Sequence, residues 1–480
     1  MHGEHRLLFA KLVVLLSYGL TGRLNFSAFI IIANLMLIGM GALIVSFLKK
    51  REYIALFVLI IILLVFNGQN AETSVYSLAG LGNIAAMFFM VLSISLVIAN
   101  RLWHFWVGVS VMSFTLFTNG NAFILIPVLA ATLWLQGKQK RMYCFLAVIL
   151  PVAVCYFATY KPAGVASINF IELAINYFCF IGNNFWVSYS ARWIPCVVGI
   201  FICLTWIYAV CKRYWQHNAK CLALFTFMLI TGAAVVINRP ESASMGDQRF
   251  RLYGCVHLVL TLLFWIEMLD RQKIMLLSKI FLPLIVCFSI TGTIVGFDRL
   301  FKITENKKAS SYNWQYHKMG LVALSYPDRV PGRVVEEAES MGVYYIPQLP
   351  LKQLQSQVEQ NNTSWSNRES DMSYGIDYCE EREGFTILRG WAYTNSGDMN
   401  RAEIKLYLIG NESVIKVIPY WECRFDVSSN RNKKYCGFFA VIPQSGIKAG
   451  EYSLGIEIRK RFIIPSKEIF SLLTDYHVTF

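Results

Sequence analysis

Long apolar runs fill the first 298 residues of this 480-residue chain and constrain its fold more than any other feature. A helix rises 1.5 Å per residue, so about 20 apolar residues cross the ~30 Å hydrocarbon core of a bilayer. Hydrophobic residues make up 56% of the chain and charged residues 15%, which argues against a soluble enzyme. We predict about ten membrane spans, near residues 26–48, 53–67, 82–100, 103–117, 122–136, 142–160, 191–211, 220–238, 252–269 and 274–296.

The basic residues of 1–298 predict the orientation of these spans, because short loops rich in Lys and Arg stay in the cytoplasm. This part carries most of the +14 net charge, which fits loops between spans better than a nucleic-acid surface. Every second loop is basic, so the loops between them and everything after Phe297 are expected outside the cytoplasm. The basic loops contain Lys49, Lys50 and Arg51, then Arg101, then Lys138, Lys140 and Arg141, then Lys212, Arg213 and Lys220, then Arg271 and Lys273.

The first 25 residues fit this pattern less simply. Leu7 to Leu20 is apolar but short, and it contains Lys11, whose charge disfavours insertion. The stretch predicts either a helix lying in the outer interface or an eleventh span.

Residues 299–480 have frequent charges and no long apolar tracts. We predict a helical extracytoplasmic connector over 299–371, with Gly342 ending a helix, and an Asn- and Ser-rich linker over 360–372. Short alternating runs then predict an extracytoplasmic β-sandwich over 372–480. The strands are expected near 384–393, 402–409, 412–419, 435–442 and 450–459.

Few carboxylates of 1–298 are expected at the outer face, so candidates for acid or base chemistry are few. Glu72 lies where an apolar span gives way to a polar loop, from which a carboxylate reaches both water and a lipid-held substrate. Glu4 lies near the beginning of the chain. The alternative for Glu72 is a helix N-terminal charge that the helix dipole stabilises.

The outward segment 239–251 contains three arginines, Arg239, Arg249 and Arg251, although outward loops are usually poor in cations. Guanidinium groups match phosphate oxygens, and the nearest anion at a bilayer surface is a lipid phosphate. Lys161 and Arg192 flank another outward loop and are candidates for the same phosphate site. Ion pairs with the carboxylates of the 239–251 segment are the alternative.

Aromatic residues of the predicted sandwich are candidates for stacking against sugar rings. Strand alternation places Trp391 and Tyr393 on one face. Trp421 is a third candidate for stacking against a sugar ring. Packing in the sandwich core is the alternative.

Several segments resemble bacterial polytopic sugar transferases of the GT-C type, similar to serotype-converting O-antigen glucosyltransferases. Gly390-Trp-Ala-Tyr, Arg424-Phe-Asp-Val and Gly437-Phe-Phe also resemble small β-sandwich modules of bacterial surface-polysaccharide enzymes. The first likeness rests on His2-Gly-Glu-His-Arg, Glu72 after a span, Phe117-Thr-Asn-Gly-Asn, Tyr156-Phe-Ala-Thr-Tyr-Lys-Pro and Arg249-Phe-Arg-Leu-Tyr.

The resemblance implies a multi-pass protein of the bacterial inner membrane with a periplasmic C-terminal domain. It would move a sugar from a polyprenyl-phosphate-linked donor to a glycan acceptor such as O-antigen of lipopolysaccharide. By position, Glu4 or Glu72 would be the base, and Arg249 and Arg251 would hold the phosphate. An O-antigen polymerase or ligase and a non-catalytic polysaccharide transport protein are the alternatives. No metal-type Cys-x-x-Cys spacing occurs, and the sequence assigns no cofactor.

Overall fold

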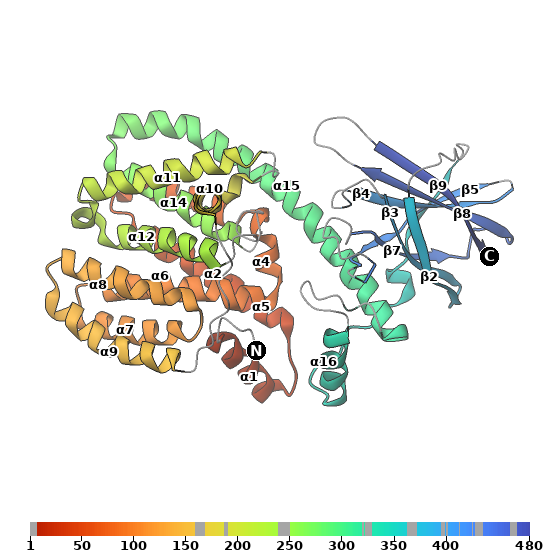
Figure 1. Cartoon of the computed structure of the whole chain (residues 1–480), viewed down its shortest axis with the longest axis horizontal. Helices are drawn as coiled ribbons and strands as arrows, with labels where there is room; N and C mark the ends of the chain where they lie inside the picture. Colours follow the sequence, from red (N-terminus) through yellow and green to blue (C-terminus); the bar gives the residue numbers. More distant parts are fainter. Residues whose placement is uncertain are drawn as a thin grey trace. The chain divides into compact units, whose positions relative to one another are not determined.

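The computed structural model describes residues 7–158, 169–186, 191–238, 250–318, 321, 329–361, 372–394, 399, 402–411, 413–424, 426–427, 435–460 and 468–480. The chain divides into two compact units, Met1–Asp298 and Arg299–Phe480. The first unit is helical, and the second is built mainly of strands (Figure 1).

The helices of the first unit follow the apolar runs of the sequence. Every run predicted as a span coincides with a helix. The helices are α1 (Leu8–Thr21), α2 (Phe26–Phe47), α3 (Ile54–Val65), α4 (Ala71–Val75), α5 (Ser77–Ala79), α6 (Ala85–Val97), α7 (Leu102–Leu116), α8 (Leu125–Leu135), α9 (Gln139–Phe157), α10 (Phe170–Ile181), α11 (Trp193–Cys211), α12 (Tyr214–Asn238), α14 (Arg251–Met268) and α15 (Arg271–His317), the last of which continues into the second unit.

Seven helical stretches among the described residues are long and apolar enough to cross a membrane. Three other runs predicted as spans form the shorter helices α3, α7 and α8, and a polar residue lies two positions after the end of α3 and of α7. Helix α10 lies in a segment predicted as an outward loop, so that segment is partly helical. The seven stretches are α2, Ser77–Val97, α9, α11, α12, α14 and α15.

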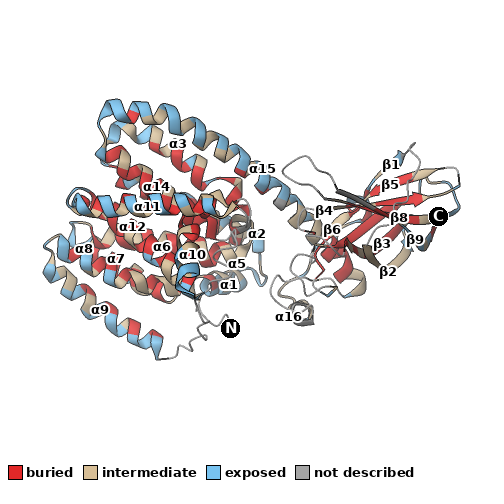
Figure 2. Ribbon diagram, turned by 45° about the horizontal axis from the view of Figure 1, so that its top comes forward, coloured by how far each residue is buried: buried red, intermediate tan, exposed pale blue. Residues whose placement is uncertain are grey.

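Many residues on the outside of the helical unit are exposed (Figure 2), and a large number of them have large apolar side chains. Leu35 of α2, Val154 of α9 and Leu204 of α11 are each about 60% exposed or more. Water-soluble proteins rarely expose so much contiguous apolar surface, whereas lipid-facing helices do so by necessity. The exterior therefore agrees with the composition in favouring a membrane environment.

The carboxylate of Glu267 joins three segments at one end of the helical unit. It accepts hydrogen bonds from the Tyr214 hydroxyl (2.5 Å), the Asn218 side-chain amide (3.1 Å) and the Lys49 backbone N–H (2.6 Å). Asn218 leaves the helical conformation inside α12, and this kink lets its side chain also donate to the Phe47 carbonyl. The fully buried carboxylate is thus satisfied by specific partners, as burial of a charge requires.

The second unit contains two antiparallel sheets that share one hydrophobic core. The strand orders are β1-β5-β4-β8-β9 and β2-β3-β7-β6, and core residues such as Leu388, Leu406 and Phe438 come from both sheets. The strands are β1 (Gln357–Asn361), β2 (Met372–Arg382), β3 (Phe385–Thr394), β4 (Ala402–Ile409), β5 (Val414–Ile418), β6 (Tyr420–Glu422), β7 (Gly437–Pro443), β8 (Glu451–Lys460) and β9 (Glu468–Thr479).

All five strands expected from alternation are present as β3, β4, β5, β7 and β8. Strand β1 corrects two expectations, because it lies inside the range 299–371 predicted as a helical connector and overlaps the predicted linker. It pairs with β5, so the sheet region begins before residue 372. Helix α16 (Arg329–Ser340) does precede it, and Gly342 follows that helix with the expected left-handed backbone at φ 68°.

A buried ion-pair network crosses the sheet that contains β3 and β6. Arg389 Nη2 lies 2.9 Å from the fully buried Glu422 carboxylate, and Arg424 pairs with Asp377 (2.5 Å) and Asp426 (2.7 Å). The register shift between Ile376 and Tyr378 is a β-bulge, which turns Asp377 toward the arginines. Burial by itself lowers the pKa of Arg424, but its carboxylate partners outweigh burial and raise that pKa above the ordinary value.

Replacing Arg389 by methionine should destabilise the second unit strongly, because Glu422 would remain as a buried carboxylate without its closest cation. Breaking one partner of a buried pair costs about 3–5 kcal/mol. The measurement is the urea dependence of protease resistance of this unit in the full-length protein. Arg459→Met is the matched control, since Arg459 is over one-third exposed and its loss should change the midpoint far less. Equal midpoints for the two variants would contradict this account.

Candidate functional site

Buried polar side chains gather at the beginning of α14, inside an otherwise apolar helical unit. Arg251 is 9% exposed and Asn183 only 1% exposed. Burying carboxamide and guanidinium groups is unfavourable unless they find partners, so such a cluster is a candidate functional site. Its members come from the turn after α3, the turn after α10 and α14 itself, and they are Asn67, Gln69, Asn70, Asn183, Asn184, Arg251 and Cys255.

Helix α14 contacts both turns through side-chain hydrogen bonds. Arg251 Nη1 donates to Gln69 Oε1 at 3.3 Å, and Nη2 lies 3.5 Å from the Trp186 carbonyl oxygen. One turn further along α14, Cys255 Sγ accepts from the Asn70 side-chain amide at 3.4 Å. Arg251 therefore bridges the segment that precedes α4 and the segment that follows α10.

The conformation of the turn after α3 is explained by the side chains of two of its own residues. Asn67 accepts a hydrogen bond from the Gln69 backbone N–H (2.9 Å), which caps the short helical turn Gly68–Asn70. Asn70 in turn donates to the Val65 carbonyl (2.9 Å) and so satisfies the end of α3. This capping directs the chain from α3 into α4, where Glu72 is the second residue.

Glycines allow the polar turns to approach α14 and α15 closely. A Cβ atom on Gly254 would lie 2.3 Å from Asn183 Oδ1, and one on Gly292 would lie 2.5 Å from Asn67 Oδ1. A Cβ on Gly296 would lie only 2.1 Å from the Gly68 carbonyl oxygen. At Gly296 the close atom is a backbone oxygen, so no other residue fits there, whereas a Cβ on Gly254 or Gly292 would force the Asn183 or Asn67 carboxamide to move.

Both side-chain polar atoms of Asn183 are buried and have no hydrogen-bond partner among the described residues. A buried amide without partners is unfavourable by about 1–3 kcal/mol per group. Such a group is satisfied by water or by a ligand with hydroxyl or similar groups. The cluster at the beginning of α14 therefore has hydrogen-bond donors and acceptors that the described residues leave without a partner.

The structure brings together two of the segments selected from the sequence. Arg251 contacts Gln69, which lies three residues before Glu72, although the Glu72 side chain is outside the described residues. Arg192 is the N-cap residue of α11 and pairs with Glu172 at 3.6 Å, with both side chains partly exposed. The other predicted residues, Glu4, Lys161, Arg239 and Arg249, lie outside the described residues.

The predicted aromatic platform is only partly assembled in the second unit. The rings of Trp391 and Tyr393 stack at 5.5 Å with an interplanar angle of 16°, and both are half-buried. Trp421 lies on the opposite face, because it pairs with Phe438 of the core while Trp391 pairs with Gly437. Its ring contacts Tyr435 at 4.8 Å, and a glycan-binding role for Trp421 stays a prediction.

Sequence reasoning missed Asn183, Asn184 and Cys255. The available signal was the Asn-Asn pair that follows Gly182 and the largely apolar stretch 170–181. Comparison of the chain with models of protein families, with curated proteins and with solved structures found no match. The assignment of function therefore depends on the residues themselves.

Replacing Gly254 by alanine should displace Asn183 and Asn184 and lower the thermal unfolding midpoint of the detergent-purified protein. The added methyl group would overlap two carboxamide oxygens, and overpacking of this kind costs about 1–3 kcal/mol. Gly19→Ala is the matched control, because a Cβ on Gly19 of α1 meets nothing within 4 Å. An unchanged midpoint for Gly254→Ala would refute the close packing described above.

Proposed function

We propose that the protein is a multi-pass membrane glycosyltransferase that moves a sugar from a polyprenyl-phosphate carrier to a surface glycan such as O-antigen. The observation that carries this proposal is the contact between Arg251 and Gln69, next to the segment that contains Glu72. It places a buried cation and a carboxylate-bearing segment together at one end of an apolar helical unit. This combination suits a lipid-linked phosphate donor and a hydroxyl acceptor.

Arg251 would hold the phosphate of the donor. A guanidinium group offers forked N–H donors that match two phosphate oxygens, and its charge acts more strongly in a buried site than in water. The charge on the lipid phosphate increases as the bond between the anomeric carbon and the phosphate oxygen breaks. A cation at that oxygen stabilises the leaving group in the transition state.

Glu72 would act as the general base. Its carboxylate would take the proton from the acceptor hydroxyl while that oxygen forms a bond to the anomeric carbon. The polyprenyl phosphate leaves with the electron pair of the broken bond, so atoms and charge balance without a further reactant. The carboxamides of Asn183 and Asn184 are both donors and acceptors, which suits them to the remaining hydroxyl groups of the donor sugar.

The second unit would hold the glycan acceptor. Trp391 and Tyr393 present two nearly parallel rings on one face of the sheet, and flat aromatic surfaces pack well against pyranose rings. With ten or eleven spans and the basic loops in the cytoplasm, this unit and the Arg251 site would both be periplasmic.

The proposed orientation is tested by fusing topology reporters after Phe480. Alkaline phosphatase, which folds only outside the cytoplasm, should be active, and a fluorescent protein that matures in the cytoplasm should be dark. Fusions after Lys140, in a basic loop, should give the reverse result. An inactive phosphatase together with a bright cytoplasmic reporter at Phe480 would reject the orientation and the periplasmic site.

Glu72→Gln should reduce glycan modification by about 10²- to 10⁴-fold, the usual contribution of a general base. Glu52→Gln is its matched control, since Glu52 lies in a loop of the opposite orientation. The measurement is the mass of the O-antigen repeating unit in cells with and without the protein. Full modification by the Glu72 variant, at a normal membrane level of the protein, would exclude Glu72 as the base.

Arg251→Ala should reduce the same modification by about 10²-fold or more, because the leaving phosphate loses its cation. Arg101→Ala should leave modification unchanged, because Arg101 is exposed and lies in a basic loop predicted on the cytoplasmic side, opposite to the Arg251 site. If the mass is unaltered in every variant but the O-antigen chain length changes, the activity is polymerisation or ligation instead.

A further inference from the structure

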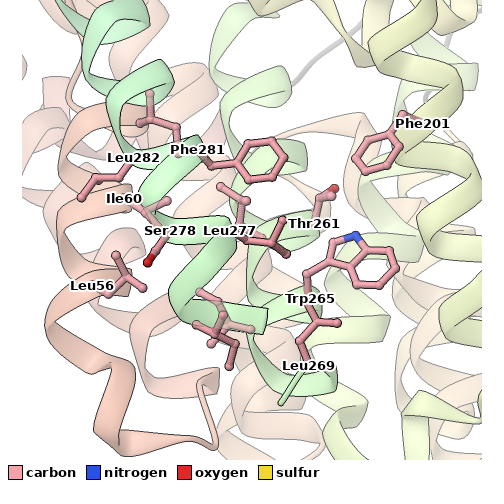
Figure 3. Close-up of a pocket in the computed structure, with 14 residues that line it drawn as sticks. Leu56, Ile60, Phe201, Thr261, Trp265, Leu269, Leu277, Ser278, Phe281 and Leu282 are labelled. Atoms are coloured by element: carbon pink, nitrogen blue, oxygen red, sulfur yellow. The ribbon is translucent and has the colours of Figure 1, made fainter. Parts of the chain in front are cut away.

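An apolar pocket of about 290 Å³ lies within the helical unit, between the first part of α15 and helices α3, α11 and α14 (Figure 3). It is near the end of α14 opposite to Arg251. In Figure 3, Leu277 and Phe281 of α15 extend toward Phe201 of α11 and Trp265 of α14. Ile60 of α3 and Leu269, just after α14, also line the pocket.

The pocket lies between two regions in which α15 packs against the rest of the unit, the second of which includes Phe288 against Phe185. Ile274 is buried at one of them, and Gly292 and Gly296 lie against the turn after α3 at the other. Between these places α15 is largely exposed, and it is the least buried of the seven long apolar helices (Figure 2). The intervening space is therefore open beside an apolar helix face.

The lining offers a ligand nothing but hydrocarbon. Its two hydroxyl groups bond to their own helices, Ser278 to the Met275 carbonyl (2.9 Å) and Thr261 to the His257 carbonyl (2.8 Å). A lining of this kind offers water no hydrogen-bond partner, so water in the pocket is unfavourable. A flexible hydrocarbon chain is the occupant that fits the lining.

Positive charge lies at one end of the pocket. The Lys50 ammonium group donates to the carbonyl of the lining residue Leu269 at 2.7 Å. Arg271 follows two residues later, at the exposed start of α15. The orientation predicted from the basic loops puts this end at the cytoplasmic surface, where anionic headgroups attract Lys and Arg.

We propose that the pocket binds one acyl chain of an anionic diacyl phospholipid, with the headgroup at Lys50 and Arg271. The chain fills the space between α14 and α15 and completes packing that the protein leaves open. This lipid site does not depend on the proposed glycosyl transfer, since it lies at the other end of α14.

The test is native mass spectrometry of the full-length protein released from nanodiscs of equal parts phosphatidylglycerol and phosphatidylcholine. The unaltered protein should retain one phosphatidylglycerol. Leu277→Trp, which fills the pocket, should reduce retention at least 10-fold, and Ser278→Phe should do the same by a second route. Leu284→Trp is the matched control, because Leu284 is 59% exposed on α15, and it should retain the lipid.

The headgroup assignment is tested by combining Lys50→Gln with Arg271→Gln. The double variant should still retain a lipid but should lose its preference for phosphatidylglycerol over phosphatidylcholine. Equal retention by Leu277→Trp, Ser278→Phe and Leu284→Trp would overturn the acyl-chain site. Retention of endogenous polyprenyl phosphate in place of the phospholipid would also overturn it. Normal folding of each variant is checked by its elution as a single species in detergent.

Discussion

Helix α14 is held at both ends by polar contacts, and the rest of the helical unit depends on these two ties. Arg251 bridges the turns after α3 and α10, while Glu267 joins α12 to the end of α2. The two residues are about 24 Å apart along the helix axis. Apolar packing is not directional, so helices that present only Leu, Ile and Phe have many similar arrangements. Hydrogen-bonded side chains at both ends select one of them, and α14 is accordingly the most buried of the long helices.

The same two ties explain why chemistry and lipid binding would occupy different ends of the unit. At the beginning of α14, glycines let carboxamide-bearing turns approach, and a dense polar cluster results. Toward its end, α15 has no glycine contact to close the gap, and an apolar pocket remains. The close approach of the turns to the start of α14 brings together polar groups that would bind a phosphate and a sugar. The gap between α15 and the end of α14 leaves space for a hydrocarbon chain.

Much of the fold could be predicted from the chain, because apolar runs and strand alternation are local signals. Every predicted span coincides with a helix, and all five predicted strands are present. Strand β2 was missed although Met372, Tyr374 and Ile376 alternate with small or polar residues, since charged residues dominate its second half. Strand β9 was missed because adjacent apolar residues such as Leu472 and Leu473 interrupt its alternation. The Tyr378 hydroxyl of β2, for example, is satisfied by Asn313 of α15, a partner 65 residues away. Such a long-range contact stabilises a strand but cannot be recognised from the sequence of the strand alone.

The sequence by itself determined the helical segments and the division between an apolar and a charged part of the chain. It also singled out the arginines of the segment 239–251 as candidates for one site. Only the tertiary structure decided that Arg251 contacts the segment before Glu72, that Asn183 joins it, and that Trp421 faces away from Trp391. The reason is physical. Hydropathy and alternation depend on neighbours along the chain, whereas a site is made by side chains from distant turns, and its assembly depends on which glycines and bulges let backbones approach.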